Sequence, residues 1–339
     1  MVGKEELEAV TRVINSGVLS GFTGNVKGHL GGEEVQALEK EWCERFEVKH
    51  AVAVNSASSG LYCALAAIDI QPEDEVIVTP YSMTISATVP LLFGAVPVFA
   101  DIERRYYCLN PRRVKEKITS KTKAIIVVDL FGLPYDADAL NKIAAEQGIY
   151  IIEDAAQAIG ATYKGRYAGT LGDIGVFSLN VHKHIQCGEG GIVVTNNNDL
   201  AERVRLMRNH AEAVIHDRFW RGENFNKRNA NMVGMNLRMT ELEAAVARVQ
   251  LSKLDRILEN VRNYAEQFDV SVRPDCKHSY YSIPTTKYRA KDNYREGYIK
   301  PIYKMPVFQS RGYTVRCPVC EEVERNIALV IPPPECFEV

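Results

Sequence analysis

The sequence lacks a long apolar run and lacks an excess of charge of either sign. Its apolar stretches do not reach the roughly 18 residues that a membrane-spanning helix needs, although 46% of the 339 residues are hydrophobic. The 41 basic and 43 acidic residues leave a formal net charge of −2. There is no basic excess to attract a nucleic-acid phosphate backbone, so nucleic-acid binding is disfavoured. Residues 1–6 are charged and have no apolar signal core, so we expect a cytoplasmic protein.

The sequence also lacks a cysteine framework. Its eight cysteines are scattered along a chain that is too long to depend on disulfides. Cys317 and Cys320 have the spacing of a zinc knuckle, but no second Cys/His pair lies at a matching distance. A structural zinc site needs four ligands, so we predict reduced thiols and no metal site.

What the sequence does contain is an alternation of short apolar runs and helical stretches between residues 50 and 195. Continuous apolar runs are typical of strands buried on both faces of a sheet. Asn110 and Pro111 open a helix that reaches Ile118, and Asp136 caps a helix over 137–147. The alternation predicts an α/β domain with a mostly parallel sheet. The predicted strands are Ala51–Val54, Glu75–Val78, Val96–Phe99, Ala124–Val128, Tyr150–Ile152 and Ile192–Thr195.

The second half of the chain carries helical signals that a polar segment interrupts. Residues 199–208 are predicted to be a helix, and the Asn-rich residues 212–235 a long surface loop. Helical periodicity is then sustained from Thr240 to Phe268, and Thr240 with Glu243 forms a capping box at its start.

The length of the chain favours two domains, because one hydrophobic core rarely serves 339 residues. We expect a large domain over residues 1–240. Residues 241–339 then supply the long linking helix and a small C-terminal domain, with strand fragments near 280–283 and 298–303 and a helix near 319–326.

Chemistry is first suggested by the turn Asn55–Gly60, which follows the strand Ala51–Val54. Small hydroxyl residues at a strand-to-helix turn expose backbone N–H groups at a helix N-terminus, which is a site for an anion such as phosphate. The alternative is simple helix capping by Ser58 or Ser59.

A second candidate is Asp154, at the carboxyl end of a buried strand, where α/β folds hold their ligands. A carboxylate there could keep a pyridine nitrogen protonated and make the ring an electron sink. Helix capping by Asp154 is an equal alternative.

The third candidate is Lys183, which follows Ser178 by five residues at the end of an apolar stretch and precedes the glycine-rich turn 188–191. A lysine in a partly dry pocket becomes a nucleophile for carbonyls and can form a Schiff base. A lone lysine is usually a solvated surface charge, so its companions carry this prediction. Either of the flanking residues His182 and His184 could be a proton shuttle or serve only packing, and for His182 we favour packing or substrate contact.

In this order, the motifs resemble those of the DegT/DnrJ/EryC1/StrS family of sugar aminotransferases. The resemblance implies the fold-type I architecture of aspartate aminotransferase: an α/β/α sandwich around a mostly parallel seven-stranded sheet, with a smaller α+β domain. It extends from about residue 15 to residue 265. The matching segments include Ser16–Gly17, Ser20–Gly21, Asn55–Gly60, Glu75–Val78, Pro97–Phe99, Asp101–Ile102, Thr122–Ile126, Glu153–Gln157, Gly172–Gly175, Phe177–Lys183, Gly188–Gly191 and Asn236–Glu241.

The resemblance assigns roles to individual residues around the cofactor pyridoxal 5'-phosphate (PLP) or its amine form (PMP). Lys183 matches the Schiff-base lysine, and Asp154 the acid that pairs with the pyridine nitrogen. The remaining matches are Gln157 with the residue on the ring oxygen, Ser56, Ala57, Ser58 and Ser178 with the phosphate contacts, Met83 with the position that covers the ring, and Asn236 with an asparagine that reaches the phosphate in the neighbouring subunit.

Three departures from the family pattern are visible. Met83 stands where many members stack an aromatic ring on the cofactor, and a thioether can also pack on a π-face. Asp129 stands where many members have a histidine. After about residue 270 the chain departs from the usual pattern, so the resemblance assigns no substrate residues there.

The implied activity is transfer of an amino group from an amino acid, L-glutamate, to a keto-sugar, a nucleotide-linked keto-deoxysugar, in amino-sugar, surface polysaccharide or antibiotic biosynthesis. The implied assembly is a homodimer whose sites are shared across the interface. Two alternatives remain: a PMP-dependent sugar dehydratase-like relative, which would lack the lysine, and a catalytically silent regulator with the same fold.

Overall fold

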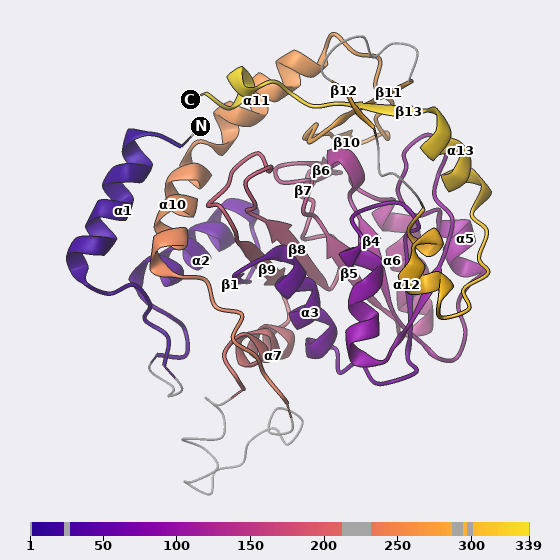
Figure 1. Ribbon diagram of the computed structural model, residues 1–339, viewed down its shortest axis with the longest axis horizontal. Helices are drawn as coiled ribbons and strands as arrows, with labels where there is room; N and C mark the ends of the chain where they lie inside the picture. The colour runs from indigo at the N-terminus through magenta and orange to yellow at the C-terminus, as the bar shows by residue number, and fades with distance from the viewer. Residues whose placement is uncertain (1, 24–27, 212–231, 287–293, 297–300, 339) are drawn as a thin grey trace, which may run out of the picture. The chain divides into compact units, whose positions relative to one another are not determined.

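The computed structural model describes residues 2–23, 28–211, 232–286, 294–296 and 301–338 (Figure 1). The chain forms two compact units. The first consists of Met1–Asp69 with Val176–Asp255, and the second of Ile70–Gly175 with Arg256–Val339. The expected domain boundary at residue 240 is a separate hypothesis and stays a prediction.

The first unit contains strands β1 (His50–Val54) and β9 (Gly191–Thr195), which pair in antiparallel register with Val54 opposite Gly191. Strand β8 (Ile174–Ser178), whose last three residues belong to this unit, follows β9 in the sheet order. Helix α10 lies alongside α1, as Figure 1 shows, and also packs on α2, while α7 packs on α3. These helices span α1 (Lys4–Ser16), α2 (Glu33–Phe46), α3 (Ala57–Ala67), α7 (Asn198–Arg208) and α10 (Glu241–Ser252).

An aromatic cluster anchors the end of β8 in this unit. Trp42 and Phe46 of α2 lie 4.9 Å apart between ring centroids, and each lies 5.3 Å from the ring of Phe177. All three side chains are buried. Burial of three large rings removes much apolar surface from water, so Ser178, the next residue, is held at a fixed point.

In the second unit the sheet order is β5-β4-β2-β3, and all three pairings are parallel. Val128 lies opposite Asp154 in the β4–β5 register, so Asp129 and Asp154 reach the same edge of the sheet. The elements of this half are β2 (Glu75–Val78), α4 (Ile85–Thr88), η1 (Val89–Phe93), β3 (Val96–Phe99), α5 (Pro111–Lys115), β4 (Thr122–Val128), η2 (Leu130–Gly132), α6 (Ala137–Gln147) and β5 (Tyr150–Asp154).

Two small antiparallel sheets complete the second unit, in the orders β10-β6-β7 and β11-β13-β12. Their strands are β6 (Thr162–Tyr163), β7 (Arg166–Tyr167), β10 (Cys276–Lys277), β11 (Ile283–Thr286), β12 (Tyr294–Glu296) and β13 (Ile327–Val330). The later helices are α11 (Leu254–Ala265), η4 (Ile302–Lys304), α12 (Pro306–Gln309), α13 (Pro318–Asn326) and η5 (Pro334–Phe337).

The α/β class, the mostly parallel sheet and the six predicted strands are confirmed. The prediction of one long helix from Thr240 to Phe268 was wrong. Helix α10 ends at Ser252 and α11 begins at Leu254, so the helix is broken at Lys253. The Lys253 N–H bonds Gln250 O, three residues back, and its ammonium pairs with Glu6 of α1. Of the predicted loop 212–235, residues 212–231 lie outside the described residues.

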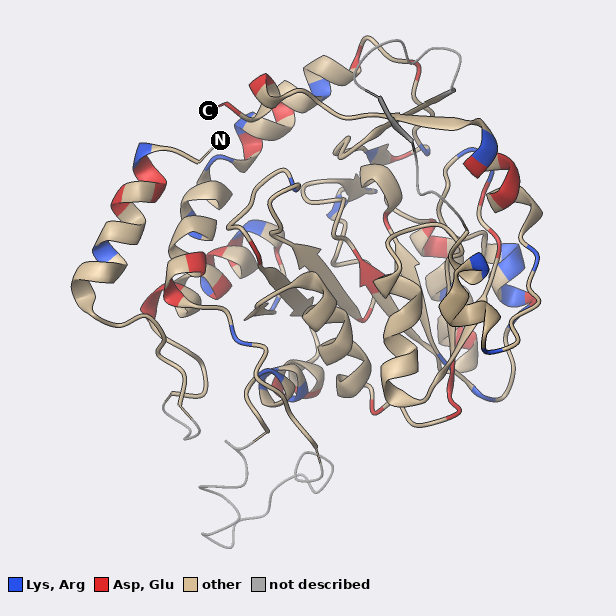
Figure 2. Cartoon of the chain, viewed as in Figure 1, with Lys and Arg blue, Asp and Glu red and all other residues tan. Residues whose placement is uncertain are grey.

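Charged side chains of both signs lie along α1, α2 and α10 (Figure 2). Arg248 of α10, for example, pairs with Glu34 and Glu41 of α2, each at 2.6 Å. The described part of the chain holds no helix that is both long enough and apolar enough to cross a membrane.

Candidate active site

The N-terminus of α3 is the candidate anion site. Ser56 is its N-cap: the backbone is extended there, and the hydroxyl oxygen accepts the Ser59 N–H at 3.1 Å. The capping residue is therefore Ser56, and not Ser58 or Ser59, which the sequence suggested and which follow it by two and three residues. The first N–H groups of a helix have no partner inside the helix, so those of Ala57 and Ser58 suit a phosphate.

Gly191 allows the turn before α3 to approach β9 closely. A β-carbon at this position would lie 2.6 Å from the Ala57 nitrogen and 2.6 Å from the Ser56 carbonyl carbon. Both are backbone atoms, so neither could move aside. The first residue of β9 is thus in direct contact with the backbone of the candidate anion site.

The segment after β8 forms a hydrogen-bonded loop that holds Lys183. The Leu179 N–H donates to Gly190 O and the Lys183 N–H to Asn180 O, both at 2.9 Å. The Lys183 side chain is half-buried, which agrees with a partly dry environment. His182 is exposed and His184 is buried, so the two histidines do not share an environment.

Asn236 lies beside β1 in the first unit. The Asn55 N–H bonds Leu237 O at 3.0 Å, and Val54 forms a β-bridge with Arg238. The Asn236 side chain is exposed, and its carboxamide oxygen accepts the Arg238 Nε–H at 2.8 Å. An exposed carboxamide of this kind is available to another molecule.

In the second unit, Asp154 is a buried carboxylate at the strand end. Its Oδ2 accepts the Ser86 hydroxyl at 2.7 Å, and its Oδ1 accepts the Ala156 N–H at 3.2 Å. No helix follows it, so it is not a helix cap. Ser86 has no sequence signal for this contact, because it comes from another element 68 residues away.

Gln157 and Met83 complete the predicted set in the second unit. Gln157 is buried, and its side-chain oxygen accepts the Phe131 N–H at 2.8 Å. Met83 is 55% exposed, so its thioether is free of the core and can pack on a ligand ring. Like the contact of Ser86, the backbone donor of Phe131 could not be identified from residue types.

The described residues contain no group of three or more His, Cys, Asp or Glu side chains that could hold a metal ion. Cys317 and Cys320 are buried free thiols, and burial raises the pKa of each. The N–H groups of Val319 and Cys320 bond the Asp101 carboxylate at 2.9 and 3.0 Å. The two cysteines therefore begin helix α13, whose N-terminus Asp101 caps.

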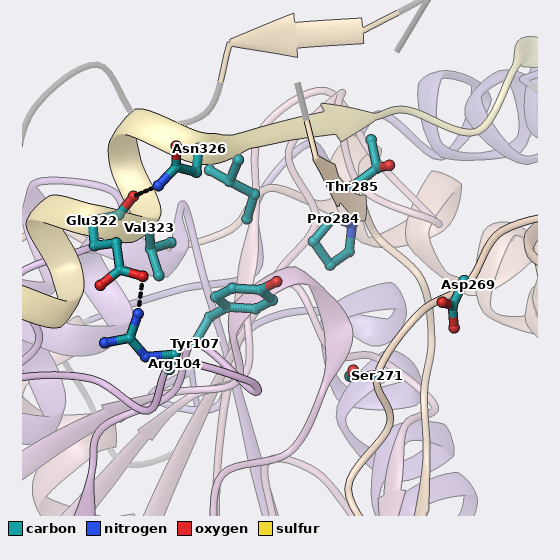
Figure 3. Close-up of a pocket in the computed structure, with 10 residues that line it drawn as sticks. Arg104, Tyr107, Asp269, Ser271, Pro284, Thr285, Glu322, Val323 and Asn326 are labelled. Carbon is teal, nitrogen blue, oxygen red and sulfur yellow. Dashed lines mark hydrogen bonds and ion pairs between the residues drawn. The ribbon is translucent and has the colours of Figure 1, made fainter. Parts of the chain in front are cut away.

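A hollow of about 390 Å³ lies elsewhere in the second unit (Figure 3). Arg104 and Glu322 form an ion pair beside it, and Tyr107 and Pro284 give it apolar surface. It contains none of the predicted site residues, and its Arg104 and Glu322 side chains already pair with each other.

The fold and these groups define a class: an α/β enzyme with a candidate anion site at a helix N-terminus, a half-buried lysine and a buried acid at a strand end. The model of the DegT/DnrJ/EryC1/StrS aminotransferase family matches residues 2–294. The chain therefore belongs to this family, whose members are PLP-dependent aminotransferases.

Solved structures agree with this assignment. An aminotransferase from Psychrobacter cryohalolentis is 27% identical, with a TM-score of 0.82, covering 99% of this chain and 94% of that one. DesV of S. venezuelae, solved with a ketimine intermediate, is 29% identical, with a TM-score of 0.82 and coverage of 98% and 91%. PseC of Helicobacter pylori, an aminotransferase of pseudoaminic acid biosynthesis, is 25% identical, with a TM-score of 0.80 and coverage of 98% and 92%.

Proposed function

We propose that this protein transfers an amino group from L-glutamate to a nucleotide-linked keto-deoxysugar, with PLP as its cofactor. The observation that carries the proposal is the half-buried Lys183 on a hydrogen-bonded loop directly after β8, in a chain that belongs to an aminotransferase family. The sugar substrate is supported by this chain's similarity to PseC, an aminotransferase involved in the biosynthesis of pseudoaminic acid.

Each unit offers polar groups that are chemically suited to a part of the cofactor. In the first unit, the N-terminus of α3 and the Ser178 hydroxyl suit a phosphate, Lys183 suits an aldehyde, and all are chemically complementary to PLP. In the second unit, Asp154 offers a buried carboxylate to a pyridine nitrogen, and Gln157 an amide to a ring oxygen. The proposed cofactor residues are Ser56, Ala57, Ser58, Met83, Asp154, Gln157, Ser178, Lys183 and Asn236.

When bound, the cofactor ring supplies an electron sink for the carbon that loses a proton. Lys183 would hold the cofactor covalently and would serve the proton transfer first as general base and then as general acid. Asp154 would favour a proton on the pyridine nitrogen, because its negative charge stabilises the protonated form. The Ser86 hydroxyl and the Ala156 N–H orient that carboxylate.

The proposed assembly is a homodimer in which Asn236 serves the phosphate site of the partner. Two observations support it: the Asn236 side chain is exposed on its own chain, and apolar side chains are exposed on and after helix α1. These are Leu7, Ile14, Val18 and Leu19. Exposed apolar patches on a soluble protein commonly mark interaction surfaces.

The first test concerns Lys183. Borohydride reduction of the protein with PLP is expected to fix the cofactor on the peptide that contains Lys183, and Lys183→Ala is expected to lose both this adduct and the visible absorbance. Lys164→Ala is the matched control, because Lys164 is an exposed lysine paired with Asp138. An adduct on another lysine, or one retained in Lys183→Ala, would contradict the proposal.

The second test concerns the substrate. Protein loaded with PMP is mixed with candidate nucleotide-linked keto-sugars, and the return of the aldehyde form is followed by absorbance. Mass spectrometry of the product then separates amination from dehydration. Turnover with keto acids but with no keto-sugar would reject the sugar assignment and leave the aminotransferase assignment in place.

A further inference from the structure

Two buried carboxyl groups lie next to the proposed pyridine-binding acid. Asp129 directly follows β4, and Glu153 precedes Asp154 in β5; both are 0% exposed. Asp129 Oδ1 accepts the Tyr135 N–H at 2.9 Å, while no N–H or O–H group of the described residues donates to Asp129 Oδ2. Neither carboxyl group is one that the proposed chemistry uses.

The hydrogen bonds decide which of the two carries a charge. Glu153 accepts three backbone N–H groups, from Gly169 at 2.6 Å, Leu171 at 2.9 Å and Gly172 at 3.2 Å, and such donors stabilise a carboxylate. Asp129 accepts only one from the described residues. Two buried carboxyl groups that interact share one proton, so the three donors to Glu153 leave that proton on Asp129, whose carboxyl group then donates a hydrogen bond to Glu153.

The other nearby titratable groups favour the same state. Burial and then the charge of Glu153 raise the pKa of Asp129 well above its usual value, and Asp154 adds to this. Burial also raises the pKa of Glu153, but Asp129 and the three N–H donors oppose that rise. Tyr135, Cys108 and Cys276 also interact with Asp129, and none of these three supplies a positive charge.

Asp129 also holds the turn that contacts Gln157. Its carbonyl accepts the Gly132 N–H at 3.2 Å, and its own N–H bonds Asp154 O at 3.1 Å. Between these bonds Phe131 has φ 62° and ψ 2°, a left-handed conformation that costs free energy in a non-glycine residue. The surrounding bonds must therefore impose it.

This left-handed residue fixes the orientation of the Gln157 amide. The Phe131 N–H can only donate, so the Gln157 atom that faces it at 2.8 Å must be the oxygen. The amide nitrogen then points the other way, as a donor. The Ser279 hydroxyl also bonds the backbone oxygen of Gln157 at 3.2 Å, which fixes the main chain.

We propose that Asp129 is a positioning residue: its protonated carboxyl group, bonded to Glu153, holds the 129–132 turn so that Phe131 directs the Gln157 NH₂ group towards the ring oxygen of the cofactor. The inference rests on the proposed cofactor site for its final contact. The state of Asp129 and the orientation of Gln157 do not depend on the cofactor.

Two substitutions separate a protonated acid from a carboxylate. Asp129→Asn keeps an acceptor for Tyr135 and offers an N–H to Glu153, so it is expected to bind PLP within about twofold of the parent, since both hydrogen bonds survive. Asp129→Ala removes both, and its PLP affinity is expected to fall up to about tenfold, the effect of one lost hydrogen bond. Absorbance titration with PLP measures both.

A double substitution tests whether Asp129 acts through Gln157. Gln157→Ala is expected to weaken PLP binding as Asp129→Ala does, and the combined variant is expected to lose no more than Gln157→Ala alone, because coupled residues are not additive. Additive losses would overturn the positioning role. So would an Asp129→Asn variant as weak as Asp129→Ala, since a charged carboxylate would then be required.

Infrared spectroscopy of the protein without cofactor tests the proton itself. The parent protein at neutral pH is expected to show the C=O stretch of a protonated carboxyl group, and Asp129→Asn is expected to lose it. Absence of that band in the parent refutes the inference, whether or not Asp129→Ala folds. If the parent shows the band but binds no PLP, the proposed function fails while the assignment of the proton to Asp129 stands.

Discussion

His29 is a buried residue whose ionisation opposes folding. Neither ring nitrogen has a hydrogen-bond partner among the described residues, and the side chain is 6% exposed. Burial, followed by the positive charges of Arg208 and Arg205, lowers the pKa of His29 to about 4. The neutral ring is therefore the form that the folded protein accepts.

This depressed pKa predicts a pH dependence of stability. Between pH 6.5 and about 4 the unfolded chain binds a proton at His29 and the folded chain does not, so the free energy of unfolding falls as the pH falls through that window. The loss is on the order of 3 kcal/mol if the full shift is realised. Urea unfolding at pH 7, 6 and 5 measures it. His29→Gln is expected to flatten the profile; an equally steep profile in that variant would contradict the assignment.

The site residues differ in how far sequence alone could locate them. Lys183 and Asp154 carry local signals, an apolar lead-in and a strand end, but their roles came from the family resemblance. Ser86 and the Phe131 N–H carry none, because one is a common residue and the other a backbone group. Their importance depends on tertiary contacts with Asp154 and Gln157.

At the scale of elements, Glu241 joins two helices. It is the first residue of α10, yet its carboxylate accepts the N–H groups of Glu34 at 2.8 Å and Val35 at 3.4 Å, in the first turn of α2. The N-cap of helix α2 is Gly32, which has no side chain to cap it. A carboxylate from another helix therefore satisfies the N–H groups that a capping residue usually takes.

Glu241→Ala is expected to lower the free energy of unfolding by about 1–2 kcal/mol, as the loss of a helix cap does. Glu241→Gln keeps an oxygen acceptor and is expected to cost less. Glu243→Ala is the comparison, because Glu243 is half-buried and its carboxylate bonds Thr240 at the start of its own helix. Chemical denaturation gives the values, and a loss at Glu241 no larger than at Glu243 would refute the capping role.

Elements with strong local patterns were predictable, and those set by tertiary contacts were not. The strands of the sheet are mostly apolar, and Asp136 and Gly148 do bound α6 as expected. Strand β8 was missed because Gly175 weakens its pattern, although a β-carbon there would lie 1.8 Å from Gly169 O. The break at Lys253 was missed because the ion pair with Glu6 has no local signature.

At the scale of the whole molecule, a shared site predicts rescue between subunits. Lys183→Ala and Asn236→Ala each damage every site of their own homodimer. In a mixed dimer, one site combines Lys183 from one subunit with Asn236 from the other. Random mixing of two symmetric dimers is expected to restore about a quarter of the sites.

The measurement is transamination at limiting PLP after the two variants are unfolded and refolded together, with each variant refolded alone as control. Activity above the sum of the two controls supports sites that span the interface. No gain, with mixed dimers demonstrated by mass spectrometry, would place Asn236 within its own subunit's site and refute the shared arrangement.

The contact between Gly191 and the backbone of Ser56 and Ala57 limits how this enzyme can be re-engineered. A saturation library at position 191 is expected to return glycine alone, since even alanine would push the whole turn outwards. To make the protein accept a bulkier or phosphate-free cofactor analogue, one would have to vary the hydroxyl residues of the turn instead. Position 191 offers no such freedom, because its neighbours are main-chain atoms.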